Sequence, residues 1–104
     1  MANIKIDWTN PSDVSDVTGI KVFQKTGAAV PGCTDYVPAN ALPTDTISGA
    51  TEVYSTNSAP LADSAGTYTC IGLPAETYHF AVFAYNSVGF SPCSATAAGT
   101  VVSS

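Results

Sequence analysis

Residues 68–91, YTCIGLPAETYHFAVFAYNSVGFS, say more about the fold than any other stretch of the chain. Short apolar runs alternate with period two on both sides of the Gly72-Leu73-Pro74 turn, and Tyr78 begins the second run. Such alternation, interrupted by turn residues, is typical of paired antiparallel strands. The stretch therefore predicts two strands, over residues 67–71 and 77–86, in an all-β, antiparallel two-sheet β-sandwich.

The same pattern extends to both sides of this stretch. Ile4, Ile6 and Trp8 alternate with polar residues, so a half-buried strand is expected there, with Trp8 central in the core. Further strands are expected over residues 18–25, 51–55 and 91–102. The expected core residues are Ile4, Ile6, Trp8, Ile20, Val22, Tyr68, Cys70, Leu73, Tyr78, Phe80, Val82 and Ala84.

Residues 27–50 contain three prolines and three glycines, a density of breakers that excludes long regular elements. A long loop or insertion is expected there, and such loops tend to be functional. The outward side chains Phe23, Phe83 and Tyr85 would form an exposed aromatic patch unless this segment folds over them. The candidate interface residues are Phe23, Tyr36, Phe83, Tyr85, Val88 and Phe90.

Length and composition limit the possible functions. With 104 residues the chain is expected to form one domain, over residues 1–104. Its net charge is −5 and it contains no Arg, so it lacks the cationic surface that nucleic acids or anionic membranes require. No apolar run approaches the ~20 residues of a membrane span, and no signal peptide is recognisable at the N-terminus. We therefore expect protein partners, neither nucleic acid nor membrane insertion.

The three cysteines are too few for a disulfide-dense scaffold. Cys70 alternates with Tyr68 on the core face, so we expect it to be a small buried side chain. Cys33 and Cys93 are the candidate disulfide pair. Sequence alone does not place two cysteines within bonding distance, so it is compatible with a disulfide between them and with two free thiols.

Nothing in the sequence indicates catalysis. The only histidine, His79, lies in mid-strand beside no motif and is expected at the surface. No metal or cofactor is expected: Asp13 and Asp16 offer too few ligands for calcium, and the cysteines lack the close spacing of zinc sites. The aromatic patch would also suit a sugar, although its burial under residues 27–50 would explain it equally well. We predict that the chain is not an enzyme.

Several segments together resemble a fibronectin type III domain. Ile4, Ile6 and Trp8 with Pro11 resemble its strand B, and residues 18–22, 68–73, 78–86 and 89–91 resemble strands C, E, F and G. Pro74 followed by Tyr78 resembles a tyrosine corner, which implies that the phenol bonds to upstream backbone. Two features depart from the family: strand A is apparently missing, which would leave the edge of strand B open, and a long insertion follows strand C.

Two functional hypotheses follow. The first is a non-catalytic structural or interaction module that assembles with copies of itself or with a larger scaffold, such as a virion surface, phage tail or other surface assembly. The missing strand could then be supplied by a neighbouring chain. The alternative is an accessory spacer or binding domain from a longer secreted bacterial protein. Together the two hypotheses imply a location on a virion, outside the cell or at the cell surface.

Overall fold

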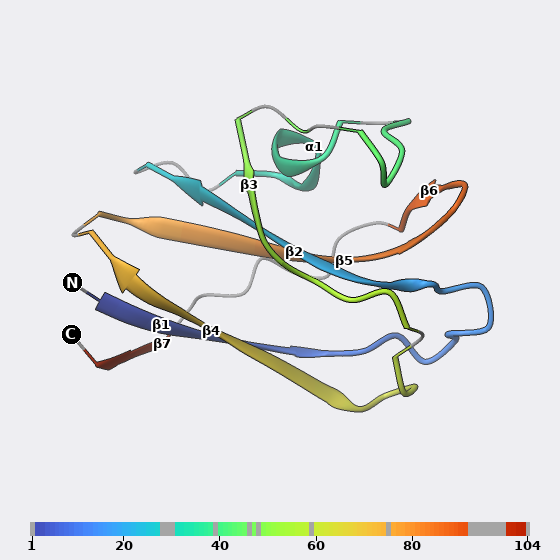
Figure 1. The fold of residues 1–104 in the computed structure, drawn as a ribbon, viewed down its shortest axis with the longest axis horizontal. Helices are drawn as coiled ribbons and strands as arrows, with labels where there is room; N and C mark the ends of the chain where they lie inside the picture. The colour runs from blue at the N-terminus through green and yellow to red at the C-terminus, as the bar shows by residue number, and fades with distance from the viewer. Residues whose placement is uncertain are drawn as a thin grey trace.

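A computed structural model describes residues 2–27, 31–38, 40–45, 47, 49–58, 60–74, 76–91 and 100–103. The described chain is all-β, with two antiparallel sheets that face one another (Figure 1). The first sheet has the order β4-β1-β7, formed by Ala65–Leu73, Ala2–Thr9 and Thr100–Ser103. The second has the order β3-β2-β5-β6, formed by Thr51–Ser55, Gly19–Thr26, Tyr78–Asn86 and Gly89–Phe90. No described helix is long and apolar enough to cross a membrane.

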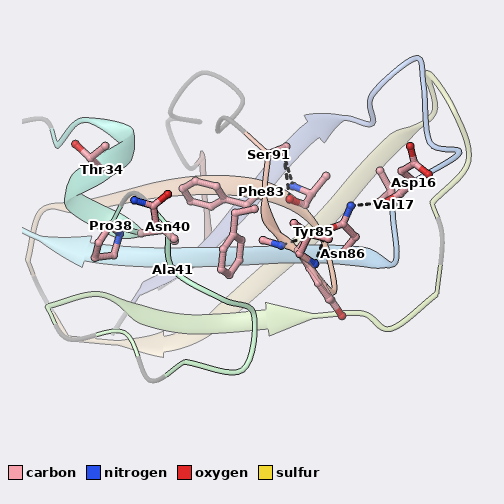
Figure 2. A pocket seen from close by; sticks show the side chains of 15 residues that line it. Asp16, Val17, Thr34, Pro38, Asn40, Ala41, Phe83, Tyr85, Asn86 and Ser91 are labelled. Atoms are coloured by element: carbon pink, nitrogen blue, oxygen red, sulfur yellow. Dashed lines mark hydrogen bonds between the residues drawn. The ribbon is translucent and has the colours of Figure 1, made fainter.

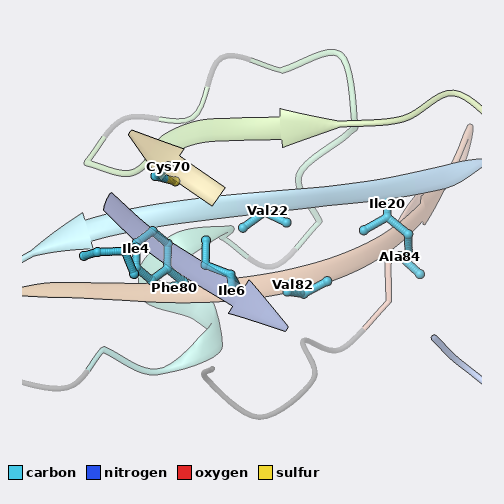
Figure 3. Close-up of a cluster of buried hydrophobic side chains, with 8 residues drawn as sticks. All are labelled: Ile4, Ile6, Ile20, Val22, Cys70, Phe80, Val82 and Ala84. Carbon is cyan, nitrogen blue, oxygen red and sulfur yellow. The ribbon is translucent and has the colours of Figure 1, made fainter. Parts of the chain in front are cut away.

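The main core lies between the two sheets, where alternate residues of the central strands meet (Figure 3). Ile6, Val22 and Phe80 are each 0% exposed. The buried members of this core are Ile4, Ile6, Ile20, Val22, Cys70, Phe80, Val82 and Ala84. Period-two alternation places these side chains on one face of each strand, so their burial holds the two sheets together.

Four residues that the sequence assigned to the core lie at its margin: Trp8, Tyr68, Leu73 and Tyr78 are only partly buried. The expectation that Trp8 is central is therefore wrong. Its ring lies over Gly66, and its indole N–H donates to Asn10 Oδ1 at 3.0 Å. Trp8 stands near the end of β1, where the sandwich opens to solvent and a polar group can find a partner.

The described residues between positions 27 and 50, hereafter the covering segment, lie across the outer face of the second sheet (Figure 1). The helix α1, Cys33–Tyr36, brings Tyr36 and Val37 against Phe23, Ala81 and Phe83 in a second buried cluster. Phe23 is 2% exposed, Phe83 3% and Tyr36 0%. The assignment of these three residues to an exposed interface is therefore wrong, because the covering segment buries them. Both faces of β5 are apolar because both are covered.

The chain ends in a different sheet from the one the sequence suggested. A single last strand over residues 91–102 was expected, but β6 pairs with β5 while β7 pairs with β1. Thr100 to Ser103 lie opposite Lys5 to Asn3, so the chain's own C-terminal strand occupies the first part of the β1 edge. The expectation of a wholly open edge there is also wrong.

Candidate functional site

An open hollow with a volume of about 630 Å³ lies where β5, β6 and the covering segment meet (Figure 2). We call it the β6 hollow. Phe83 and Tyr85 reach it from β5, Phe90 from β6, and Val37 and Ala41 from the covering segment. The remaining lining residues are Asp16, Val17, Thr34, Pro38, Asn40, Ala84, Asn86, Val88, Gly89 and Ser91. Most of the side chains on its floor are apolar.

The turn beside the hollow is held by Asn86. Its side-chain amide donates to the carbonyl oxygen of Asp16 at 3.0 Å, and its Oδ1 accepts the backbone N–H groups of Val88 and Gly89 at 2.9 and 3.2 Å. An Asn side chain that closes its own turn in this way fixes the loop geometry. As a result Val88 projects from a tight, well-bonded turn, with 81% of its surface exposed.

Ser91 secures the other end of β6. Its backbone N–H donates to the Ala84 carbonyl at 2.8 Å, and its hydroxyl lies 3.0 Å from that carbonyl and 3.1 Å from the Ala84 N–H. β6 contains only two residues, so these contacts extend its attachment to β5. The hollow is therefore bordered by a short edge strand that is fixed at both ends.

Tyr85 has a structural role in addition to its place in the lining. Its hydroxyl donates to the carbonyl of Thr56, just after β3, and Lys21 Nζ lies 5.2 Å from its ring centroid. Lys21 also forms an ion pair with Glu52. Gly19 leaves room for this arrangement, since a Cβ there would lie 2.1 Å from the Thr56 carbonyl oxygen. The half-buried Tyr85 ring thus joins three strands and is not free for a partner.

The structure brings four of the six candidate interface residues, Phe83, Tyr85, Val88 and Phe90, to the β6 hollow. Of these four residues only Val88 is widely exposed. Phe90 is half-buried, and its ring centroid lies 6.1 Å from that of Phe23 and 5.7 Å from that of Phe83. Phe90 also lines a second, smaller hollow of about 270 Å³ with Phe23, Pro43, Asp45, Ile47 and Glu52. Phe23 reaches that second hollow only, and Tyr36 lines neither.

Sequence reasoning did not single out Val37 or Ala41 as site residues. Both lie in the covering segment, whose path over the sheet no local pattern specifies. One signal was available: Tyr36 and Val37 are adjacent large apolar residues between Pro31 and Pro38, in a stretch of small and polar residues. Such a pair within a breaker-rich loop indicates a point at which the loop docks on the domain.

Within the described part of the chain, no group of three or more His, Cys, Asp or Glu side chains could hold a metal ion. Asp13 accepts hydrogen bonds from the Ser15 hydroxyl and N–H at 2.7 and 3.0 Å, which lowers the pKa of its carboxyl group. His79 is half-buried, with Nε2 2.9 Å from the Gly27 carbonyl oxygen. Each of these polar groups has a local structural partner.

Burial raises the pKa of the Cys70 thiol and so reduces the fraction of reactive thiolate. Cys70 is 6% exposed and free, as expected for a core side chain. The structure does not test the proposed disulfide between Cys33 and Cys93, because Cys93 and the side chain of Cys33 lie outside the described residues. Their pairing remains a prediction from the sequence.

Comparisons with protein-family models, with curated proteins and with solved structures each found no match for this chain.

Proposed function

We propose that this chain is a non-catalytic interaction module that assembles with copies of itself or with a larger protein scaffold, such as a virion surface, phage tail or other surface assembly. The observation that carries this proposal is the exposed Val88 side chain beside the apolar β6 hollow. An apolar side chain held out on a rigid turn gains free energy by docking into a partner, about 1.5 kcal/mol or more if fully buried.

A protein partner suits the β6 hollow better than a small polar ligand does. The Asn86 amide already donates to the Asp16 carbonyl, its Oδ1 accepts from the Val88 N–H, and the Tyr85 hydroxyl donates to the Thr56 carbonyl. Small-molecule sites usually present a few unengaged polar groups that fix the ligand's orientation. An open, mostly apolar hollow with a protruding Val88 has the character of a protein contact, in which apolar side chains interdigitate.

The fold is also consistent with a fibronectin type III-like sandwich, the finer assignment that we propose. The Tyr78 hydroxyl donates to the Pro74 carbonyl at 2.7 Å, which is the tyrosine-corner bond expected from the resemblance. The order β3-β2-β5-β6 corresponds to a C′-C-F-G sheet, and β4 beside β1 to E beside B. In this proposal β7 takes the place of strand A. Domains of this kind are common protein-binding scaffolds.

Photo-crosslinking in cells that make the protein tests this proposal. A photoreactive benzophenone amino acid in place of Val88 should yield a discrete adduct, whereas the same residue in place of Thr26 should not. Thr26 is exposed and pairs with Tyr78, at the opposite end of β5 from β6, so it is a matched control. An adduct of twice 10.6 kDa indicates self-assembly, and one with a different, defined protein indicates a scaffold. Equal, diffuse labelling at both positions would contradict the proposal.

A further inference from the structure

The outer edge of β4 stands apart from the other sheet edges of the molecule. The described sheets end in β4, β7, β3 and β6, which contain nine, four, five and two residues. β4 has no charged residue and no proline in the sequence AGTYTCIGL. Proteins usually protect long edges with charges, prolines or bulges, since an unpaired edge attracts other strands. β4 has none of these protections along most of its length.

The regularity of β4 adds to this argument. From Ala65 to Cys70 its residues lie in unbroken register opposite Thr9 to Ile4, and the only shift comes beyond Cys70. On the other side of β4, no strand of the described chain is paired with it. Over these six residues the β4 edge therefore has no bulge, and no described strand pairs with its outer side.

The solvent face of β4 is apolar or uncharged as well. Thr67 and Thr69 are exposed there, and Ile71 follows with 75% of its surface exposed. The nearest charges on this face, Lys5 and Asp7, lie on β1 and pair with one another at 3.7 Å. A strand added beside β4 would therefore meet β-branched side chains and no unpaired charge.

We propose that β4 is a strand-addition surface, and that its occupant is β4 of a second copy of this chain, paired antiparallel across a two-fold axis. A self-complementary edge closes at the dimer, because each copy uses its single β4. The two sheets would join into one with the order β7-β1-β4-β4-β1-β7. The Ile71 end of one strand would then lie toward the Ala65–Thr67 end of the other, which would bury Ile71 without opposing two charges.

The charge of the chain opposes this pairing, and the size of that opposition can be measured. Each chain carries a net charge of −5, and Asp63 and Glu76 flank the two ends of β4. In an antiparallel pair these carboxylates would approach their counterparts from the second copy. Salt screens such repulsion, so we expect the dimer to become tighter as ionic strength rises. An interface held by ion pairs would show the opposite dependence.

This surface is independent of the β6 hollow, because β4 and β6 belong to different sheets. Sedimentation equilibrium of the purified chain, from about 1 μM to about 1 mM, measures the proposed dimer. Thr69→Lys should weaken dimerisation about tenfold, because it places a charge in each of two paired strands. Thr51→Lys is the control: it makes the same change of charge at an exposed residue on the β3 edge.

A second measurement does not depend on a substitution. Hydrogen exchange of the wild-type chain should show backbone amides in β4 that become protected as concentration rises, with no such change in β3. The inference is overturned if the chain stays monomeric to about 1 mM. That result would leave the β4 edge to a strand from another protein. It is also overturned if Thr69→Lys and Thr51→Lys associate as the wild type does. In either case the crosslinking result at Val88 is unaffected, so the two proposals can fail separately.

Discussion

At the scale of single residues, Tyr36 is the least expected member of the buried cluster. Its side chain is fully buried, yet its hydroxyl has no hydrogen-bond partner within the described chain. An unsatisfied buried polar atom costs about 1–3 kcal/mol, whereas the ring itself stabilises the fold by packing on β2 and β5. The ring of Tyr36 therefore stabilises the folded chain, whereas its unbonded hydroxyl destabilises it.

Replacement of this tyrosine tests that description. Tyr36→Phe should leave the free energy of unfolding unchanged or raise it by up to about 1 kcal/mol, measured by denaturant titration. Tyr36→Ala, which removes the ring, should lower it by about 3 kcal/mol or more. A clear loss of stability in Tyr36→Phe would show that the hydroxyl makes a stabilising bond.

The free energy of unfolding of the wild type and of Tyr36→Phe should also depend differently on pH. Burial, together with the charge of Asp35, raises the pKa of Tyr36 above its ordinary value of 10.0. The unfolded chain then loses the phenol proton at lower pH than the folded chain does, so stability falls as pH rises above about 10. Tyr36→Phe lacks this contribution, and its stability advantage should increase between pH 9 and about 11. An unchanged difference would contradict the raised pKa.

Gly66 controls the position of the only tryptophan. A Cβ at this position would lie 2.2 Å from Trp8 Cε2, so an alanine forces the ring or the strand to move. We expect Gly66→Ala to lower the free energy of unfolding by about 2 kcal/mol, and to cost much less when Trp8 is also Ala. Additive effects in this double-mutant cycle would show that the ring does not lie against Gly66.

At the scale of elements, β6 both completes the second buried cluster and forms one side of the hollow. Phe90 contacts the rings of Phe23, Phe83 and Tyr85, whereas Val88, two residues earlier, is exposed. Phe90→Ser should therefore lower the free energy of unfolding by about 2 kcal/mol, and Val88→Ser by less than about 0.5 kcal/mol. Equal losses for the two variants, measured by denaturant titration, would contradict this division of roles.

Most strands could be predicted from the sequence because period-two alternation is local. The expected strand over residues 51–55 matches β3, and the strands expected over residues 18–25 and 77–86 differ from β2 and β5 by one residue at one or both ends. The sheet that receives the last strand was not predictable. Alternation says that residues 100–103 suit a strand, but it does not say which edge they will join.

The candidate site could be predicted only in part, because local alternation does not specify which segments come together. The sequence indicated Phe83, Tyr85, Val88 and Phe90 as candidate interface residues, and the structure places all four at one hollow. It could not show which of them remain exposed, because exposure depends on the path of the covering segment. That path is set by the distant contact of Tyr36 and Val37 with Phe23 and Phe83, which has no sequence period.

At the scale of the whole molecule, the two proposed contact surfaces lie on different sheets. In these proposals the β6 hollow would face a partner at the edge of the four-stranded sheet, while a strand added at β4 would extend the three-stranded sheet. A chain that pairs with its copy through β4 would present two β6 hollows to one scaffold. Two weak contacts joined in this way bind more tightly than either alone, which suits a small assembly module.

The most direct test of the proposed self-assembly is the mass of the chain in solution, measured by light scattering over a wide range of concentration, with and without reductant. We predict a mass that rises from 10.6 kDa toward twice that value as concentration increases. Reductant should not change it, since the proposed β4 contact uses no disulfide, and salt should favour the heavier species. A mass that stays at 10.6 kDa up to about 1 mM in both low and high salt would contradict self-assembly.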